Sequence, residues 1–175
     1  MLMNADFGML LLRLVVGLLF VGHGSQKVFG WFGGKGMAGQ TAAMERMGVQ
    51  PARVWAWVSA LGELLGGLGL VTGLLTPFAA TLIIGSMLVA IVRVHWPKGL
   101  WNSNGGIEFP LTLATVAFVT GLAGPGLYSL DYALRLALPE PVTYVAALAA
   151  MVIVVVVGVV AVPRAARQHQ SGTKA

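Results

Sequence analysis

The sequence predicts an all-α, polytopic membrane protein: a four-helix transmembrane bundle followed by a fifth, C-terminal transmembrane helix. Hydrophobic residues make up 57% of the 175 residues and charged residues only 10%, against about 25% charged residues in ordinary soluble domains. The mean hydropathy is +0.84, and five continuous apolar runs approach the roughly 20 residues that a helix needs to cross a bilayer. A soluble fold of this composition would expose large apolar patches, so a soluble enzyme and a disordered chain are both excluded.

The predicted spans are residues 7–29, 54–75, 78–94, 107–122 and 142–162. The first is expected to stay in the protein as a span, because no positive charge precedes it and Arg13 interrupts its apolar run, unlike a signal peptide. The second and third are separated only by Thr76 and Pro77, so they must be antiparallel neighbours, and proline suits the first turn of a helix. The stretch 35–50 is polar enough to be a loop or a short interfacial helix.

These spans divide the chain into three predicted parts. Residues 1–135 form a four-helix membrane domain, residues 136–163 an extra transmembrane helix, and residues 164–175 a basic polar tail. The extra helix is purely apolar after Tyr144, which predicts an anchor or a lipid-facing partner surface. The chain contains no cysteine, which excludes disulfides, thiolate nucleophiles and iron–sulfur clusters. A redox role would therefore need a bound cofactor or a partner protein.

The distribution of lysine and arginine predicts the orientation in the membrane. With five crossings, one side receives most of the positive charge and the other receives Arg13 and Arg135. Because basic loops stay in the cytoplasm, we expect a multi-pass protein of the inner (cytoplasmic) membrane with its N-terminus outside and its C-terminus in the cytoplasm. The net charge of +5 then indicates contact with anionic lipid headgroups rather than with nucleic acid. The basic side holds Lys35, Arg46, Arg53, Arg93, Lys98, Arg164, Arg167 and Lys174.

Ionisable residues inside the predicted spans mark the candidate site, because such groups are costly in a bilayer. His23 and Lys27 are four residues apart and so share one face of the first helix. Glu63 lies about 14 Å into the second helix at 1.5 Å per residue, too deep to reach water, and needs a hydrogen-bond donor. Arg13 is close to the end of the first helix and is expected to extend to the interface.

Two further polar residues are predicted on the same, cytoplasmic side of the membrane as His23 and Lys27. His95 ends the third helix and Glu108 begins the fourth, so polar groups from four helices should converge on the cytoplasmic half of the bundle. We expect Lys27 to pair with Glu63 or with Glu108, with a histidine hydrogen-bonded beside the pair. A seam of small residues that would let a neighbouring helix approach closely lies next to the carboxylate: Gly62, Gly66, Gly69 and Gly73.

Three interpretations of this cluster remain open from the residues alone. The first is a polar network that holds four helices in register. The second is a proton-accepting pocket for a small lipid-soluble redox carrier such as a quinone, since histidine and carboxylate side chains exchange protons. A haem held by His23 and His95 is the third interpretation, disfavoured because both residues lie near the interface. No metal-ligand cluster is evident, and His169 in the tail is expected to be solvated.

An ordered set of short motifs resembles the DoxX family of small bacterial membrane proteins. The set begins with Leu-Leu-Arg-Leu at 11–14 and Gly-His-Gly at 22–24 with Lys27, and it continues with Glu63 and the glycines that follow it. It ends with Gly-Gly-Ile-Glu-Phe-Pro at 105–110, Gly-Pro-Gly at 124–126 and Ser-Leu-Asp at 129–131. Within the last motif, Asp131 is expected to cap a short helix over 132–138.

The resemblance implies a four-helix bundle in the cytoplasmic membrane, with members that act as small subunits of quinone-linked oxidoreductases or as integral partners in membrane redox complexes. His23, Lys27, Glu63 and Glu108 would then be catalytic and His95 would contact the cofactor, which would be a quinone. The first alternative is a non-catalytic scaffold that recruits soluble redox enzymes to the membrane. The second is a small-solute or proton-linked transporter that uses Glu63, although no inverted repeats are evident.

Overall fold

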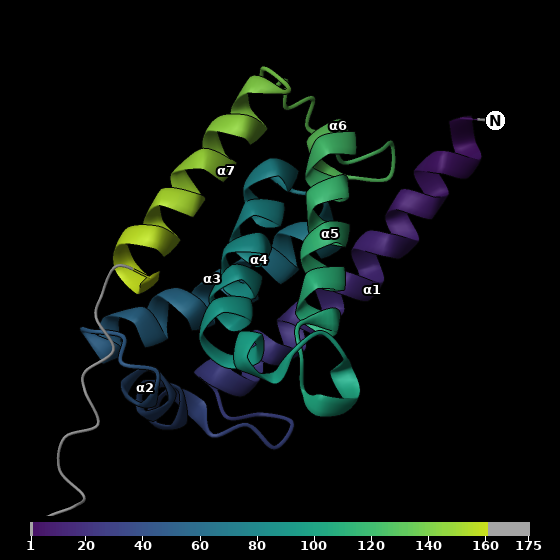
Figure 1. Ribbon diagram of the computed structural model, residues 1–175. Helices are drawn as coiled ribbons and strands as arrows, with labels where there is room; N and C mark the ends of the chain where they lie inside the picture. The colour runs from purple at the N-terminus through teal and green to yellow at the C-terminus, as the bar shows by residue number, and fades with distance from the viewer. Residues whose placement is uncertain (1, 161–175) are drawn as a thin grey trace, which may run out of the picture.

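The computed structural model describes residues 2–160, and every regular element in that range is helical (Figure 1). The α-helices are α1 (Leu2–Val28), α2 (Gly36–Arg46), α3 (Ala52–Thr72), α4 (Thr76–Ala90), α5 (Glu108–Ala123), α6 (Leu130–Ala133) and α7 (Val142–Val155). Two of them continue as π-helical turns, α4 over Ile91–His95 and α7 over Val156–Val160. The polar stretch after the first span is therefore mostly the short helix α2. The tail predicted for 164–175 lies outside the described residues.

Four helices are long and apolar enough to cross a membrane: Ala5–Val28, Ala52–Thr72, Thr76–Lys98 and Val142–Val159. This confirms the predicted all-α, polytopic membrane fold. The fourth predicted span, 107–122, corresponds to α5, an apolar helix of 16 residues. At 1.5 Å per residue it is about 24 Å long, somewhat less than the roughly 30 Å of a bilayer's hydrocarbon core.

The helix ends gather on two opposite faces of the bundle (Figure 1). On the first face, which we call the amino-terminal face, the backbone N–H of Leu127 donates to Asp6 in the first turns of α1, and that of Asp131 donates to the carbonyl of Gly73 after α3. The second face carries α2 and the connection from α4 to α5, with exposed Lys35, Arg46 and Lys98; we call it the basic face. Since α5 runs from the basic face to the amino-terminal face, the described chain passes between the two faces five times.

Glycines allow the central helix α3 to contact two neighbours closely. A Cβ atom on Gly67 would lie 2.6 Å from the backbone nitrogen of Val21 in α1, and one on Gly24 would lie 2.6 Å from the backbone of Leu64. On the other side of α3, a Cβ on Gly69 would lie 2.6 Å from Ala79 in α4. Three members of the predicted seam, Gly62, Gly66 and Gly69, thus face α4, whereas Gly73 lies against Arg13 and Ser129. The close contact with the α1 backbone uses Gly67, which the seam did not include.

Helix α7 is seated on the bundle rather than standing apart as an anchor. A Cβ atom added to Gly85 of α4 would clash with the Met151 side chain, and one added to Gly121 of α5 would clash with Tyr144. The buried Tyr144 hydroxyl also donates to the carbonyl oxygen of Phe118 at 3.1 Å. The expectation that this helix is merely an anchor or a lipid-facing surface is therefore incomplete, because one face of α7 belongs to the packed interior.

Candidate functional site

A buried ion pair joins α1 to α3. The Lys27 Nζ atom donates to Glu63 Oε1 at 2.6 Å, and Glu63 is only 4% exposed. Glu63 lies near the middle of its 21-residue helix, about 17 Å from the start at 1.5 Å per residue. Of the two carboxylates considered from the sequence, Lys27 pairs with this one. The second carboxylate oxygen, Oε2, is buried and has no hydrogen-bond partner within the described residues.

Two neutral polar side chains extend the pair toward α2. Ser59 precedes Glu63 by one helical turn, and its Oγ atom accepts a hydrogen bond from Lys27 Nζ at 3.3 Å. The same oxygen accepts from Gln40 Nε2 of α2, also at 3.3 Å. The Lys27 ammonium thus has a charged and a neutral acceptor, and α2 is connected to the site through Gln40. A hydroxyl that accepts twice still has its own proton to donate.

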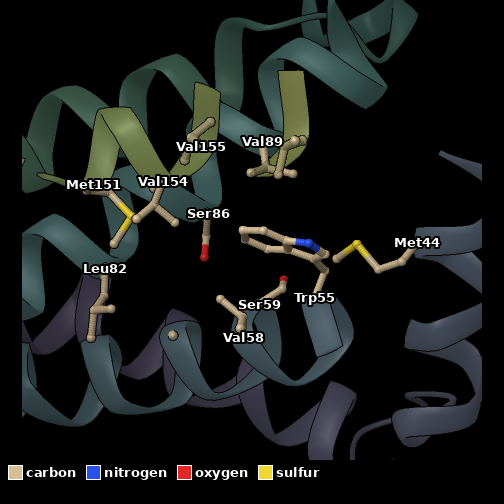
Figure 2. A pocket seen from close by; sticks show the side chains of 13 residues that line it. Met44, Trp55, Val58, Ser59, Leu82, Ser86, Val89, Met151, Val154 and Val155 are labelled. Carbon is tan, nitrogen blue, oxygen red and sulfur yellow. The ribbon is translucent and has the colours of Figure 1, made fainter. Parts of the chain in front are cut away.

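Ser59 also lies at the edge of a small apolar pocket between α3, α4 and α7 (Figure 2). Figure 2 shows the Ser59 and Ser86 hydroxyls pointing into it from opposite sides, beside the Trp55 ring. Met151 and Val155 form its wall on α7. The cavity volume is about 60 Å³, less than half of the roughly 150 Å³ that holds a benzene ring in an engineered protein cavity. The pocket therefore has room for a few water molecules and not for an aromatic ring.

His23 lies on the outer side of α1, away from the ion pair. Its side chain is exposed, and its Nδ1 atom is 3.3 Å from Gln26 Oε1. The Gln26 Nε2 atom in turn donates to the carbonyl oxygen of Phe32 at 3.2 Å. His23 and Lys27 are therefore on adjacent rather than identical faces of the helix, since Lys27 points to α3 and His23 to the surface.

Glu108 and His95 hold the connection between α4 and α5. The exposed Glu108 carboxylate accepts a hydrogen bond from the backbone N–H of Asn102 at 2.8 Å. His95 Nδ1 is 2.6 Å from the carbonyl oxygen of Gly105, so Nδ1 carries the proton and donates it. The predicted convergence of four helices on one polar cluster is thus only partial: the structure brings Lys27 and Glu63 together and leaves Glu108 and His95 in this loop.

Arg13 is fully buried, and the expectation that it extends to the interface is wrong. Its Nη1 atom donates to the carbonyl oxygen of Leu70 at 3.3 Å, and its Nη2 atom donates to that of Tyr128 at 2.5 Å. Both acceptors lie near the amino-terminal face, where α3 ends and the segment after α5 crosses over. The guanidinium therefore joins three parts of the chain, which a side chain in the headgroup region could not do.

Asp131 caps a different helix from the one expected. Its two carboxylate oxygens accept hydrogen bonds from the backbone N–H groups of Leu75 and Thr76, at 2.7 and 3.0 Å, and so close the start of α4. The short helix α6, which covers only Leu130–Ala133, is capped instead by Ser129, whose Oγ accepts from Tyr132 N–H. The prediction for Asp131 considered only neighbours in sequence, and this contact spans 55 residues.

Sequence reasoning overlooked the neutral members of these networks. Ser59, Gln40 and Gln26 carry no charge and therefore did not stand out among the ionisable residues. Helical spacing offered a usable signal for two of them, since Ser59 precedes Glu63 by four residues and Gln26 follows His23 by three. Gln40 offered none, because its contact depends on how α2 folds back beside α3.

A comparison with protein-family models identifies one family, DoxX, over residues 8–96. The match covers slightly more than half of the chain and runs from α1 to the end of the π-helical turn after α4. It contains His23, Lys27, Glu63 and His95, whereas Glu108, α5 and α7 lie beyond it. Comparisons with curated proteins and with solved structures gave no match. The chain is an integral membrane protein that belongs to the DoxX family.

Proposed function

We propose that this protein is a membrane subunit of a quinone-linked oxidoreductase complex, in which Lys27 and Glu63 handle the protons of the reaction. The observation that carries the proposal is the Glu63 carboxylate, buried at mid-span with one oxygen on Lys27 and the other without a partner. A carboxylate in this position is costly in a membrane and marks a functional site by default. Its free oxygen is a position at which a proton can be held.

The role proposed for Lys27 and Glu63 is proton transfer, not electron transfer. A quinol that is oxidised to a quinone releases two electrons and two protons. The protons pass to protein bases, of which Glu63 is the buried one, and the electrons pass to a redox centre on a partner subunit. Because the chain has no cysteine, the redox centre must be a bound cofactor or belong to a partner, and we assign it to a partner.

The proposed orientation places the basic face, with α2, in the cytoplasm of the cell and the complex in the inner membrane. The basic side chains of that face support it, since Lys35, Arg46, Arg53 and Lys98 are all exposed. On the opposite face the exposed basic side chain within the described residues is Arg135. Redox partners that dock from the cytoplasm would meet α2, which Gln40 connects to Ser59 and so to Lys27.

The test is Glu63→Gln in the full-length protein within its native membrane complex, with quinone-dependent turnover as the readout. Glutamine keeps the size and an acceptor for Lys27 but cannot take up a proton, so we expect turnover to fall at least tenfold while the complex still assembles. Ser86→Ala serves as a matched control, because it also removes a polar group from the pocket region but leaves the ion pair intact. Unchanged turnover in a correctly assembled Glu63→Gln complex would contradict the proposal.

A non-catalytic scaffold is the second candidate, favoured by the exposed aromatic side chains beside α2 on the basic face. Phe29, Trp31 and Phe32 are all more than half exposed there, a composition typical of the buried centre of a protein interface. A scaffold would capture the same soluble redox enzymes from membranes whether or not Glu63 is present. Pull-downs with the Glu63→Gln protein, with turnover measured on the same sample, separate the two roles.

A further inference from the structure

A groove runs along the outer face of α1, adjacent to the face that carries Lys27. The residues that line it are Val15, Leu18, Leu19, Gly22, His23, Gln26 and Phe32. The space along it is about 470 Å³ and is largely open to the surroundings, so a bound ring would lie along the helix surface, whereas the pocket beside Ser59 is too small for one. Of the two cavities next to α1 and α3, this groove is the one that can admit a ring.

Hydrogen bonds determine how His23 faces the groove. The carbonyl oxygen of Phe32 can only accept, so the amide nitrogen of Gln26 must point to it and the amide oxygen to His23. That oxygen can also only accept, so His23 Nδ1 carries the proton. In the neutral ring Nε2 is then an acceptor, and within the described residues it has no hydrogen bond. The groove thus holds one oriented acceptor that is ready for a hydroxyl group.

The loop that supports this arrangement has an unusual backbone. Phe32 adopts φ of +51°, a left-handed conformation that bulky residues rarely take. The Phe32 carbonyl accepts a hydrogen bond from Gln26, and the residue, which is 75% exposed, is part of the groove's lining. Unfavourable backbone conformations of this kind tend to persist at binding sites.

Gly22 has no packing role that would explain the absence of a side chain. A Cβ atom added to Gly22 would meet nothing within 4 Å, whereas one added to Gly24 would collide with the backbone of α3. The two glycines on either side of His23 therefore differ: Gly24 lets α1 contact α3, and Gly22 is part of the open lining of the groove.

We propose that this groove binds the ring of a membrane quinol, with a ring hydroxyl donating to His23 Nε2 and the apolar tail lying along Leu19 and Val15. His23 is about 8 Å from the basic end of α1 at 1.5 Å per residue, the depth of a polar headgroup, while Val15 and Leu18 lie toward the bilayer centre and are exposed. The inference rests on the proposed function and locates the substrate on the outer side of α1, one helical turn from Lys27.

The experiment measures equilibrium binding of a short-tailed ubiquinol to the full-length protein in its purified complex. In Gly22→Leu the new side chain fills the groove, and we expect affinity to fall at least tenfold. Gly8→Leu is the matched control, because Gly8 is on the same helix, is exposed, and also has nothing within 4 Å of an added Cβ. It should bind like the wild type. His23→Ala should weaken binding as well, because it removes the acceptor.

The outcomes separate this inference from the proposed function. If Gly22→Leu binds quinol as tightly as Gly8→Leu and the wild type, the groove is occupied by ordinary lipid and the inference is wrong, while the quinone-linked function stands. If the wild-type complex binds no quinol, the proposed function fails and the groove assignment falls with it. Thermal unfolding of both glycine variants in detergent confirms that a loss of binding does not come from misfolding.

Discussion

The carboxylate of Asp131 accepts a hydrogen bond from the backbone N–H of Thr76 at 3.0 Å, and so caps a helix that begins 55 residues earlier in the chain. The first N–H groups of a helix have no partner within it, and inside a membrane protein water is scarce to replace one. Near the same face, Arg13 binds the carbonyl oxygens of Leu70 and Tyr128. These two buried ionisable residues connect α1, α3, α4 and the segment after α5.

Asp131→Ala should therefore destabilise the bundle although Asp131 is far from the candidate site. Loss of a helix cap costs about 0.5–2 kcal/mol, and the substitution also leaves Arg13 without its nearby carboxylate. Asp131→Asn keeps one acceptor oxygen, so its thermal unfolding midpoint in detergent should lie between those of the wild type and of Asp131→Ala. A midpoint for Asp131→Ala equal to that of the wild type would show that the cap contributes nothing.

The two glycines beside His23 should respond differently to the same substitution. Gly24→Val forces a branched side chain against the α3 backbone, where overpacking of this kind costs about 1–3 kcal/mol, so the folded yield and the unfolding midpoint should fall. Gly22→Val, two residues away on the same helix, should leave both nearly unchanged because its Cβ meets open space. Equal losses in the two variants would mean that α1 does not contact α3 as described.

The seating of α7 can be tested by cross-linking, since the chain has no cysteine of its own. In Gly85→Cys/Met151→Cys the two new side chains occupy positions that contact each other in the structure, so oxidation should give an intramolecular disulfide, seen as a faster-migrating band. Gly85→Cys/Ile153→Cys is the control, because Ile153 is exposed on another face of α7. A bond that forms equally well in both variants would indicate a mobile helix.

The proposed topology predicts which loops a membrane-impermeant thiol reagent reaches in intact cells. Tyr132→Cys, exposed on the amino-terminal face, should be labelled without permeabilisation. Ser103→Cys, exposed in the connection from α4 to α5 on the basic face, should be labelled only after permeabilisation. The reverse pattern would invert the proposed orientation, and labelling of both from outside would show that the short helix α5 does not cross the membrane.

Much of the fold could be predicted from the sequence because a bilayer imposes strong rules on composition and length. The long apolar runs are local signals that correspond to helices in the structure. Pro77 correctly marks the start of a helix, although Thr76 and Pro77 belong to the first turn of α4 and the junction itself is residues 73–75. The packing of α7 against α4 and α5 could not be predicted in this way. Its contacts depend on Gly85 and Gly121, and no local pattern shows which distant side chain such a glycine admits.

The sequence predicted the candidate site only for residues whose depth in the membrane shows that the side chain must be buried and paired. Glu63 lies so deep in its helix that it requires a partner, and Lys27 supplies one. Arg13, Glu108 and His95 lie close to helix ends, where spacing alone does not tell a solvated side chain from a buried one. Arg13 is buried because backbone carbonyls from two other segments reach it, and such long-range acceptors leave no trace in the sequence.

The measurement that tests the central claim most directly is the quinone-dependent turnover of the Lys27→Met/Glu63→Leu double variant in its assembled complex. Replacing a buried ion pair by apolar residues of similar size is often neutral for stability, whereas removing one partner alone costs about 3–5 kcal/mol. The double variant should therefore fold and assemble like the wild type, and Lys27→Met alone should be clearly less stable. If Lys27 and Glu63 handle the protons, the stable double variant loses turnover at least tenfold; if it turns over at the wild-type rate, the pair is structural only.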